Sequence, residues 1–199
     1  MYYFIELSLI PDESVPSGFV LGKVMDVLHL CFVNVQKDLG HNPVGLSFPQ
    51  YRYDPEAKGE TNGSLGSQIR LYAQDEAHLE SLCLKQQLRR FEDYVHVRAI
   101  REDAAKLGFA CFKRVQCRSS IERLVRRRMT RQGESPEQAK QRVQTFKEQQ
   151  SDLPFAHLHS QSSEQAFRLF IAKQTVPEST GKWQFSSYGL SGTVGVPST

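Results

Sequence analysis

Hydrophobic and polar positions follow two different periods along the first hundred residues. Apolar and polar side chains alternate among β-forming residues over residues 2–10, which predicts a first strand. Apolar positions at helical spacing predict a helix over residues 17–39, and Asp75 can cap a second helix that runs to about residue 91. Three further segments favour strands, at residues 44–48, 68–73 and 94–100. The polar, glycine-containing residues 54–66 predict a loop. This order of elements, βαββαβ, is that of a ferredoxin-like fold.

The second half of the chain predicts shorter elements. A strand over residues 109–116 precedes a very basic helical segment, and Ser135 and Pro136 begin another helix as N-cap and first-turn residue. Residues 155–159, 167–173 and 183–188 favour three short strands, and residues 192–199 favour irregular structure. We therefore expect an α+β protein with a ferredoxin-like domain over residues 1–100. A second domain over residues 101–199 would combine the basic helix with a small sheet.

Arginines are concentrated on one side of the basic helix. Because each helical residue advances ~100° around the axis, one arc of roughly 140° collects four of them together with Thr130. These are Arg123, Arg126, Arg127 and Arg131. Ile121, Val125 and Met129 occupy the opposite side, and Ser119 or Ser120 can cap the helix. The apolar side can dock on a protein core while the arginines face solvent or a ligand.

Charge is unevenly distributed along the chain. Residues 98–147 hold 14 basic and 5 acidic residues, a net +9, whereas the remaining residues carry a net −6. A solvated charged face usually mixes signs, but here only Glu122 offsets the arginines of the helix. The pattern favours binding of nucleic-acid phosphates over a bland charged surface.

Composition narrows the class of protein further. The chain has 199 residues and 39% hydrophobic content, enough to build a core. Its 4 cysteines form no CxxC pair and favour reduced, buried thiols in a cytoplasmic protein. We expect neither a signal peptide nor a membrane-spanning segment, since no run approaches ~18 apolar residues.

A few polar side chains are candidates for chemistry. His29 lies outside the apolar stripe of the first helix, where an imidazole can serve as a general acid or base, although a lone helix histidine is more often structural. His157 and His159 share one strand face, but no third metal ligand is evident nearby. A serine hydrolase is unsupported because no GxSxG elbow is present. Arg114 and Gln116 alternate on a strand and can either read base edges or contact phosphates.

Short motifs occur in a colinear order over nearly the whole chain. They are PD at 11–12, the histidine at 29, VGLSFP at 44–49, RVQ, ERL and the arginine cluster within 114–131, LPF at 153–155, SQS at 160–162, FRLFI at 167–171 and YGLS at 188–191. With this set the chain resembles the CRISPR repeat-processing endoribonucleases of type I-F systems.

The resemblance implies an activity and the residues that perform it. His29 matches the catalytic histidine, Ser160 the serine that holds the nucleophilic ribose, Tyr188 a tyrosine that orients the histidine, and Ser162 a supporting serine. The implied reaction is metal-independent attack of a 2′-hydroxyl on its own 3′ phosphate, which leaves a cyclic phosphate and a 5′-hydroxyl and needs no cofactor.

The resemblance also implies an RNA hairpin as substrate and retained product, and subunits of a type I-F interference complex as partners. The second domain, over residues 101–199, would bind the hairpin. The expected RNA-binding residues are Arg114, Gln116, Ser119, Arg123, Arg126, Arg127, Arg131 and Phe167, the last of which stacks on the terminal base pair.

Two departures from the family pattern and two other functions remain open. Thr130 occupies a position where relatives commonly have arginine. His159, just before the SQS motif, also replaces an arginine that is common in relatives, and it can compete with His29 as the catalytic imidazole. A subunit that holds the hairpin without cutting it would need the same arginines. A DNA-binding regulator is less favoured, because nothing resembles a helix-turn-helix dimer.

Overall fold

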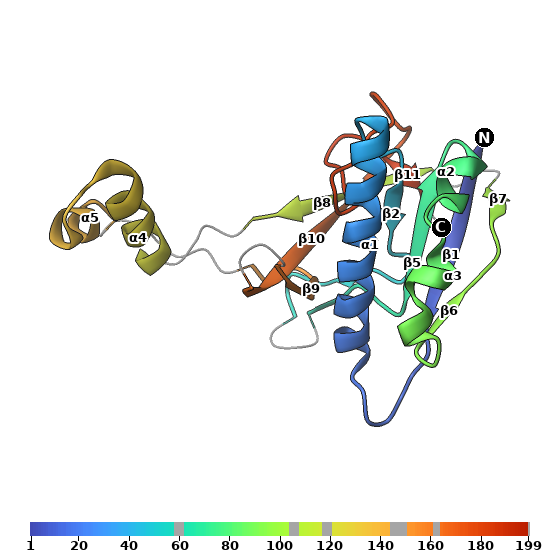
Figure 1. Cartoon of the computed structure of the whole chain (residues 1–199), viewed down its shortest axis with the longest axis horizontal. Helices are drawn as coiled ribbons and strands as arrows, with labels where there is room; N and C mark the ends of the chain where they lie inside the picture. Colours follow the sequence, from blue (N-terminus) through green and yellow to red (C-terminus); the bar gives the residue numbers. More distant parts are fainter. Residues whose placement is uncertain (58–61, 104–107, 117–120, 144–150, 161–163, 199) are drawn as a thin grey trace. The chain divides into compact units, whose positions relative to one another are not determined.

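The computed structural model describes residues 1–57, 62–103, 108–116, 121–143, 151–160 and 164–198 (Figure 1). The chain forms two compact units, one made of Met1–Val115 and Leu153–Thr199 and the other of Gln116–Asp152. The mixture of helices and strands expected from the sequence is confirmed. The domain boundary expected at residue 100 stays a prediction, and the last strands pack with the N-terminal ones in the larger unit.

The larger unit begins with the expected alternation of strands and helices. β1 (Tyr2–Leu9) is followed by α1 (Ser17–Leu39), β2 (Gly45–Ser47), β5 (Gln68–Ala73), two short helices and β6 (Val95–Val97). The strands form an antiparallel sheet in the order β2-β5-β1-β6, and β7 (Arg101–Asp103) also pairs with β1. The first strand of the βαββαβ order therefore lies between the third and the fourth.

One face of this sheet and the apolar face of α1 make the core. Ile5, Leu7 and Leu9 alternate inward along β1, and Leu28 and Phe32 of α1 are fully buried. By length and composition alone, α1 is apolar enough to cross a membrane. A helix that lies in a protein core passes the same test, and α1 supplies a large part of this core.

A second antiparallel sheet contributes the rest of the larger unit. It is built from β8 (Phe109–Val115), β9 (Phe155–His159), β10 (Ala166–Val176) and β11 (Val196–Pro197), in the order β11-β8-β10-β9. β11 corrects the expectation that residues 192–199 are irregular. β9 lies against α1, and the approach is so close that a Cβ on Gly22 would come within 2.1 Å of the carbonyl oxygen of His157.

The smaller unit consists of α4 (Ile121–Gln132) and α5 (Pro136–Val143). Ser135 caps α5 as expected, since its hydroxyl accepts a hydrogen bond from the Gln138 amide at 3.3 Å. Val125 and Ala139 are buried between the two helices. Met129 was expected beside Val125 on the apolar side but is 39% exposed. The apolar side of α4 is therefore narrower than the sequence pattern indicated.

Three other expected elements differ in the structure. The helix over residues 75–91 is broken into α2 (Glu76–Glu80), α3 (Leu84–Gln87) and a 3-10 turn at Arg89–Phe91, because Cys83 adopts a φ of +46°. Cys83 is also exposed, contrary to the expected burial. The strand over 94–100 is interrupted between β6 and β7. In the loop over 54–66, β4 (Gly63–Ser64) pairs with β3 (Arg52–Tyr53).

Candidate active site

His29 projects from α1 toward a turn near the C-terminus of the chain. Its ring stacks on that of Tyr188, with centroids 4.2 Å apart and planes 8° from parallel. The Nδ1 atom lies 2.7 Å from the carbonyl oxygen of Ser187. A carbonyl oxygen can only accept, so Nδ1 carries hydrogen and donates. In the neutral imidazole, Nε2 is then the basic nitrogen, and among the described residues nothing is hydrogen-bonded to it.

The turn that carries Ser187 and Tyr188 is fixed by main-chain hydrogen bonds. The Ser186 amide donates to the Leu190 carbonyl at 3.0 Å, and the Leu46 amide of β2 donates to the Gly189 carbonyl at 2.7 Å. Gly189 has a φ of +68°, a conformation that favours glycine. Residues 183–188 were expected to form a strand, and this prediction is wrong. The segment makes a single bridge, from Phe185 to Asn42, and then turns.

Asn42 joins this turn to the start of β2. Its side chain is 1% exposed and donates to the carbonyl oxygens of Val44, at 3.1 Å, and of Ser186, at 2.8 Å. Its own oxygen accepts from the Val44 amide at 3.0 Å. A buried amide that satisfies its hydrogen bonds in this way fixes both segments, and it thereby fixes the carbonyl that orients His29.

A cation lies beside the stacked rings. The guanidinium carbon of Arg114, near the end of β8, is 5.4 Å from the ring centroid of Tyr188 and 5.8 Å from that of Phe167 on β10. Burial raises the pKa of Tyr188, an effect that Arg114 opposes, so its hydroxyl stays protonated at neutral pH. His29, Tyr188, Arg114 and Phe167 thus form one surface that combines an imidazole, two aromatic rings and a positive charge.

The end of β9 is tied to the same part of α1. Asp26, three residues before His29, accepts a hydrogen bond from the His159 amide at 3.2 Å. Burial raises the pKa of Asp26, and the bond from His159 opposes the rise. Ser160 follows directly, and its amide donates to the Gln165 carbonyl at 2.9 Å across the β9–β10 connection. Ser160 is therefore one residue from the point at which β9 is anchored to α1.

The other expected site residues either belong to the smaller unit or lie outside the described residues. Arg126, Arg127 and Arg131 are exposed on α4. Gln116 follows β8 and belongs to the smaller unit. Ser119, Ser162 and the side chain of Arg123 lie outside the described residues.

Sequence reasoning did not identify Asp26, Asn42 or the Ser187 carbonyl. Asp26 was the one with a local signal, because it lies one helical turn before His29. Within the described ranges, no three or more His, Cys, Asp and Glu side chains are grouped so that they could hold a metal ion.

Comparison with known proteins agrees with the resemblance stated from the motifs. A CRISPR-associated endonuclease Cas6/Csy4 from Escherichia coli (strain UTI89 / UPEC) is 30% identical over 99% of each chain. A protein of the same name from Pseudomonas aeruginosa (strain UCBPP-PA14) is 29% identical over 96% of each. A solved structure named CRISPR associated protein Cas6 covers 98% of this chain and 99% of its own at 10% identity, with a TM-score of 0.31. The family model for CRISPR-associated protein (Cas_Csy4) matches residues 4–198, and the chain belongs to this family.

Proposed function

We propose that this protein is an endoribonuclease that cleaves the repeat hairpin in CRISPR precursor RNA by metal-independent attack of a 2′-hydroxyl. Family membership and two relatives named as endonucleases support the activity. The observation that carries the mechanism is the hydrogen bond from Nδ1 of His29 to the Ser187 carbonyl. It leaves the opposite ring nitrogen of the neutral imidazole unprotonated and available as a general base.

In the proposed reaction, Nε2 of His29 takes the proton of the 2′-hydroxyl at the cleavage site. The 2′ oxygen forms a bond to the adjacent phosphorus while the bond from phosphorus to the 5′ oxygen of the next nucleotide breaks. The leaving oxygen takes a proton from water and becomes a 5′-hydroxyl, His29 returns its proton to solvent, and the other product ends in a 2′,3′-cyclic phosphate. The nucleophile belongs to the substrate and lies beside its target, so correct positioning supplies much of the rate acceleration.

The neighbours of His29 suit the remaining tasks. Tyr188 stacks on the imidazole and would hold the ring in its orientation. Ser160, next to the anchored end of β9, would hold the ribose, with Ser162 in support. Arg114 lies near both Tyr188 and Phe167, where it would link this surface to the end of the stem.

Hairpin binding would use a second set of side chains. Phe167 would stack on the last base pair of the stem, while Arg114 and Gln116 would contact the bases next to it. The exposed Arg126, Arg127 and Arg131 of α4, with Arg123 and Ser119, would bind stem phosphates. Cleavage outside the stem leaves these interactions unchanged, so the protein would keep its product and carry it into a type I-F interference complex.

The test is cleavage of the repeat hairpin in EDTA. All-ribose RNA is compared with RNA that has a single 2′-deoxy nucleotide at the cleavage site 3′ of the stem. We expect the all-ribose RNA alone to be cut, with a cyclic phosphate on the product, and His29→Ala to abolish cutting while hairpin binding persists. Cleavage of the deoxy substrate would refute the mechanism. Binding of both RNAs without cleavage would favour the alternative, a hairpin-binding subunit without catalysis.

His159 needs its own comparison, because it is exposed and lies one residue before Ser160. Its amide is bonded to Asp26, but this bond does not orient its ring. We therefore expect His159→Ala to retain most of the activity that His29→Ala loses. The reverse result would assign the base to His159.

A further inference from the structure

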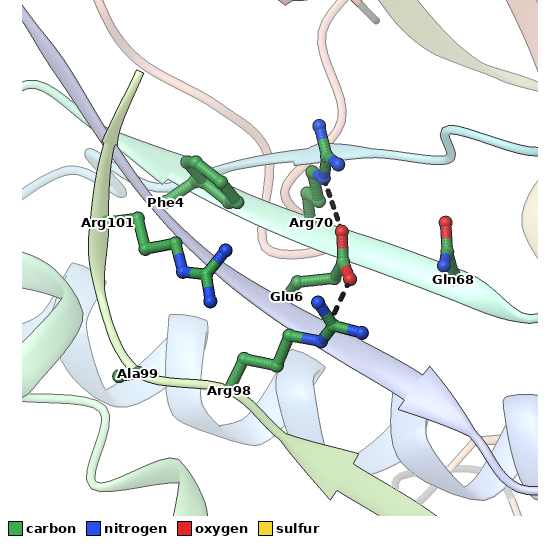
Figure 2. Close-up of a pocket in the computed structure, with 7 residues that line it drawn as sticks. All are labelled: Phe4, Glu6, Gln68, Arg70, Arg98, Ala99 and Arg101. Carbon is green, nitrogen blue, oxygen red and sulfur yellow. Dashed lines mark hydrogen bonds and ion pairs between the residues drawn. The ribbon is translucent and has the colours of Figure 1, made fainter.

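A cavity of about 250 Å³ opens on the side of the first sheet opposite to its buried face. Figure 2 shows its lining, in which Glu6 of β1 lies between Arg70 of β5 and Arg98 after β6. Arg101 extends toward Glu6 from β7, beside Phe4. Glu6 and Arg70 are directly opposite each other in the register of β1 and β5, so their side chains point to the same face. None of these residues belongs to the surface around His29.

Positive charge exceeds negative charge in this cavity. Both oxygens of Glu6 are engaged, one with Nε of Arg70 at 2.7 Å and the other with Nε of Arg98 at 3.2 Å. Arg101 makes no ion pair with the described part of the chain. Three guanidinium groups against one carboxylate give a net charge of +2. Two arginines already exceed what neutralising a buried carboxylate needs, and like charges held close together repel each other. Such a site favours an additional anion.

The arginines are also held in position for a ligand. Glu6 is 4% exposed, and the guanidinium carbon of Arg70 lies 4.9 Å from the ring centroid of Phe4. The side chain of Arg70 is therefore held by Glu6 on one side and by Phe4 on the other. Binding through Nε leaves the terminal nitrogens of Arg98 outside its ion pair, whereas the guanidinium of Arg70 also hydrogen-bonds to the Tyr72 hydroxyl. The side chain of Arg98 is 44% exposed and can reach an incoming group. Fixed guanidinium groups match the paired oxygens of a phosphate.

We propose that this cavity binds a backbone phosphate of the single-stranded RNA that is continuous with the hairpin. The proposal rests on the proposed function, which keeps one RNA molecule on the protein. Binding of a second part of a strand that is already held is intramolecular, so its effective concentration is high and even a weak site fills. An acidic segment of a protein partner lacks this advantage. The cavity would thus guide the strand that leaves the hairpin, away from the catalytic surface.

The test measures how much a single-stranded extension adds to hairpin binding. Fluorescence anisotropy compares an uncleavable hairpin with the same hairpin carrying a 5′ oligo-uridine extension, over a series of salt concentrations. We expect the extension to increase affinity by roughly tenfold, the size of one charge-assisted hydrogen bond. Arg101→Glu should remove most of this gain without changing affinity for the bare hairpin. The slope of log affinity against log salt concentration should become shallower by about 0.7 for each phosphate that the variant no longer binds.

Matched controls separate the site from general charge effects. Arg90→Glu changes the same charge at an exposed position outside the cavity and should keep the gain. The proposal is overturned if the extension adds nothing, if Arg101→Glu keeps the gain, or if both variants lose it equally. Failure of the bare hairpin to bind would instead overturn the proposed function. The oligo-uridine strand is also titrated without the hairpin. Arg101→Glu must weaken binding of this free strand as well.

Discussion

Replacing Gly22 by alanine tests whether the packing of α1 on β9 holds the candidate active site together. A Cβ at residue 22 would lie 2.1 Å from the carbonyl oxygen of His157, whereas ordinary contacts begin at 3.4 Å. The obstacle is a main-chain atom of a paired strand and cannot rotate away. The helix and the strand would therefore have to separate by more than 1 Å. Overpacking of this kind typically costs about 1–3 kcal/mol, and an unyielding backbone places the cost near the upper end.

Gly18→Ala provides the matched control on the same helix. Nothing lies within 4 Å of a Cβ there, so only a helix-propensity gain should appear, smaller than the roughly 0.5–1 kcal/mol of a helix interior because Gly18 lies in the first turn. Gly22→Ala, in the helix interior, has at least this gain, so the difference between the two variants gives a minimum value for the packing cost. We expect Gly18→Ala to unfold at higher urea concentration than the wild type and Gly22→Ala at lower concentration.

The same substitution should affect activity, because α1 carries His29 and β9 leads into Ser160. A displacement of about 1 Å can reduce the rate of a positioned reaction by roughly 100-fold. Single-turnover cleavage by Gly22→Ala is measured where the variant is fully folded, with Gly18→Ala alongside. If Gly22→Ala is as stable and as active as Gly18→Ala, the close approach of α1 and β9 is not a feature of the folded protein.

Three other predictions follow from burial and charge. Burial raises the pKa of Asp26 above its ordinary 3.8, so the protonated carboxyl contributes its full stabilisation below pH 3.8 and loses it as the pH rises through the raised pKa. Urea unfolding should therefore show the wild type losing stability relative to Asp26→Asn as the pH rises through this range. A stability difference that does not change with pH would contradict this. Arg127→Ala should weaken hairpin binding without loss of stability, because Arg127 is exposed. Arg128→Ala should weaken binding and also destabilise the smaller unit, because Arg128 contacts Glu134 at 3.2 Å. Equal effects of the two variants on thermal unfolding would oppose this. Mass spectrometry of the native protein after brief alkylation should find Cys83 labelled and Cys31, whose pKa is raised by burial, protected; the opposite order would be incompatible with the fold.

The sequence predicted elements well where local patterns decide the structure. The bounds of α1 were predicted as Ser17–Leu39, because a long apolar face lies between Pro16 and Gly40. The helix over 75–91 failed because a positive φ at Cys83, which has a side chain, leaves no trace in the hydrophobic pattern. Trp183 was expected in a strand for its β-forming ring, but its indole instead donates to the Pro43 carbonyl at 2.8 Å. Tertiary interactions decided that segment.

The candidate site shows the same division. His29, Tyr188 and Arg114 were named from motifs, and the structure brings their side chains together. The hydrogen-bond partners of the site were not predicted, because Asn42 and Ser187 act across more than 140 residues of sequence. A main-chain carbonyl has no sequence signature at all. Which side chains meet was therefore more accessible to sequence reasoning than what holds them in place.

The bond between His29 and the Ser187 carbonyl determines how the site would tolerate mutation. Its acceptor is a main-chain atom, so many side chains at position 187 would leave the imidazole tautomer unchanged. The position that restricts mutation is instead Gly189, which has a φ of +68°. A Cβ added there would lie 2.7 Å from the Leu46 side chain and 2.9 Å from the Phe32 side chain, so other residues are excluded. A library of variants covering this turn should therefore lose activity at Gly189 and accept changes at Ser187, whose carbonyl is bonded to His29.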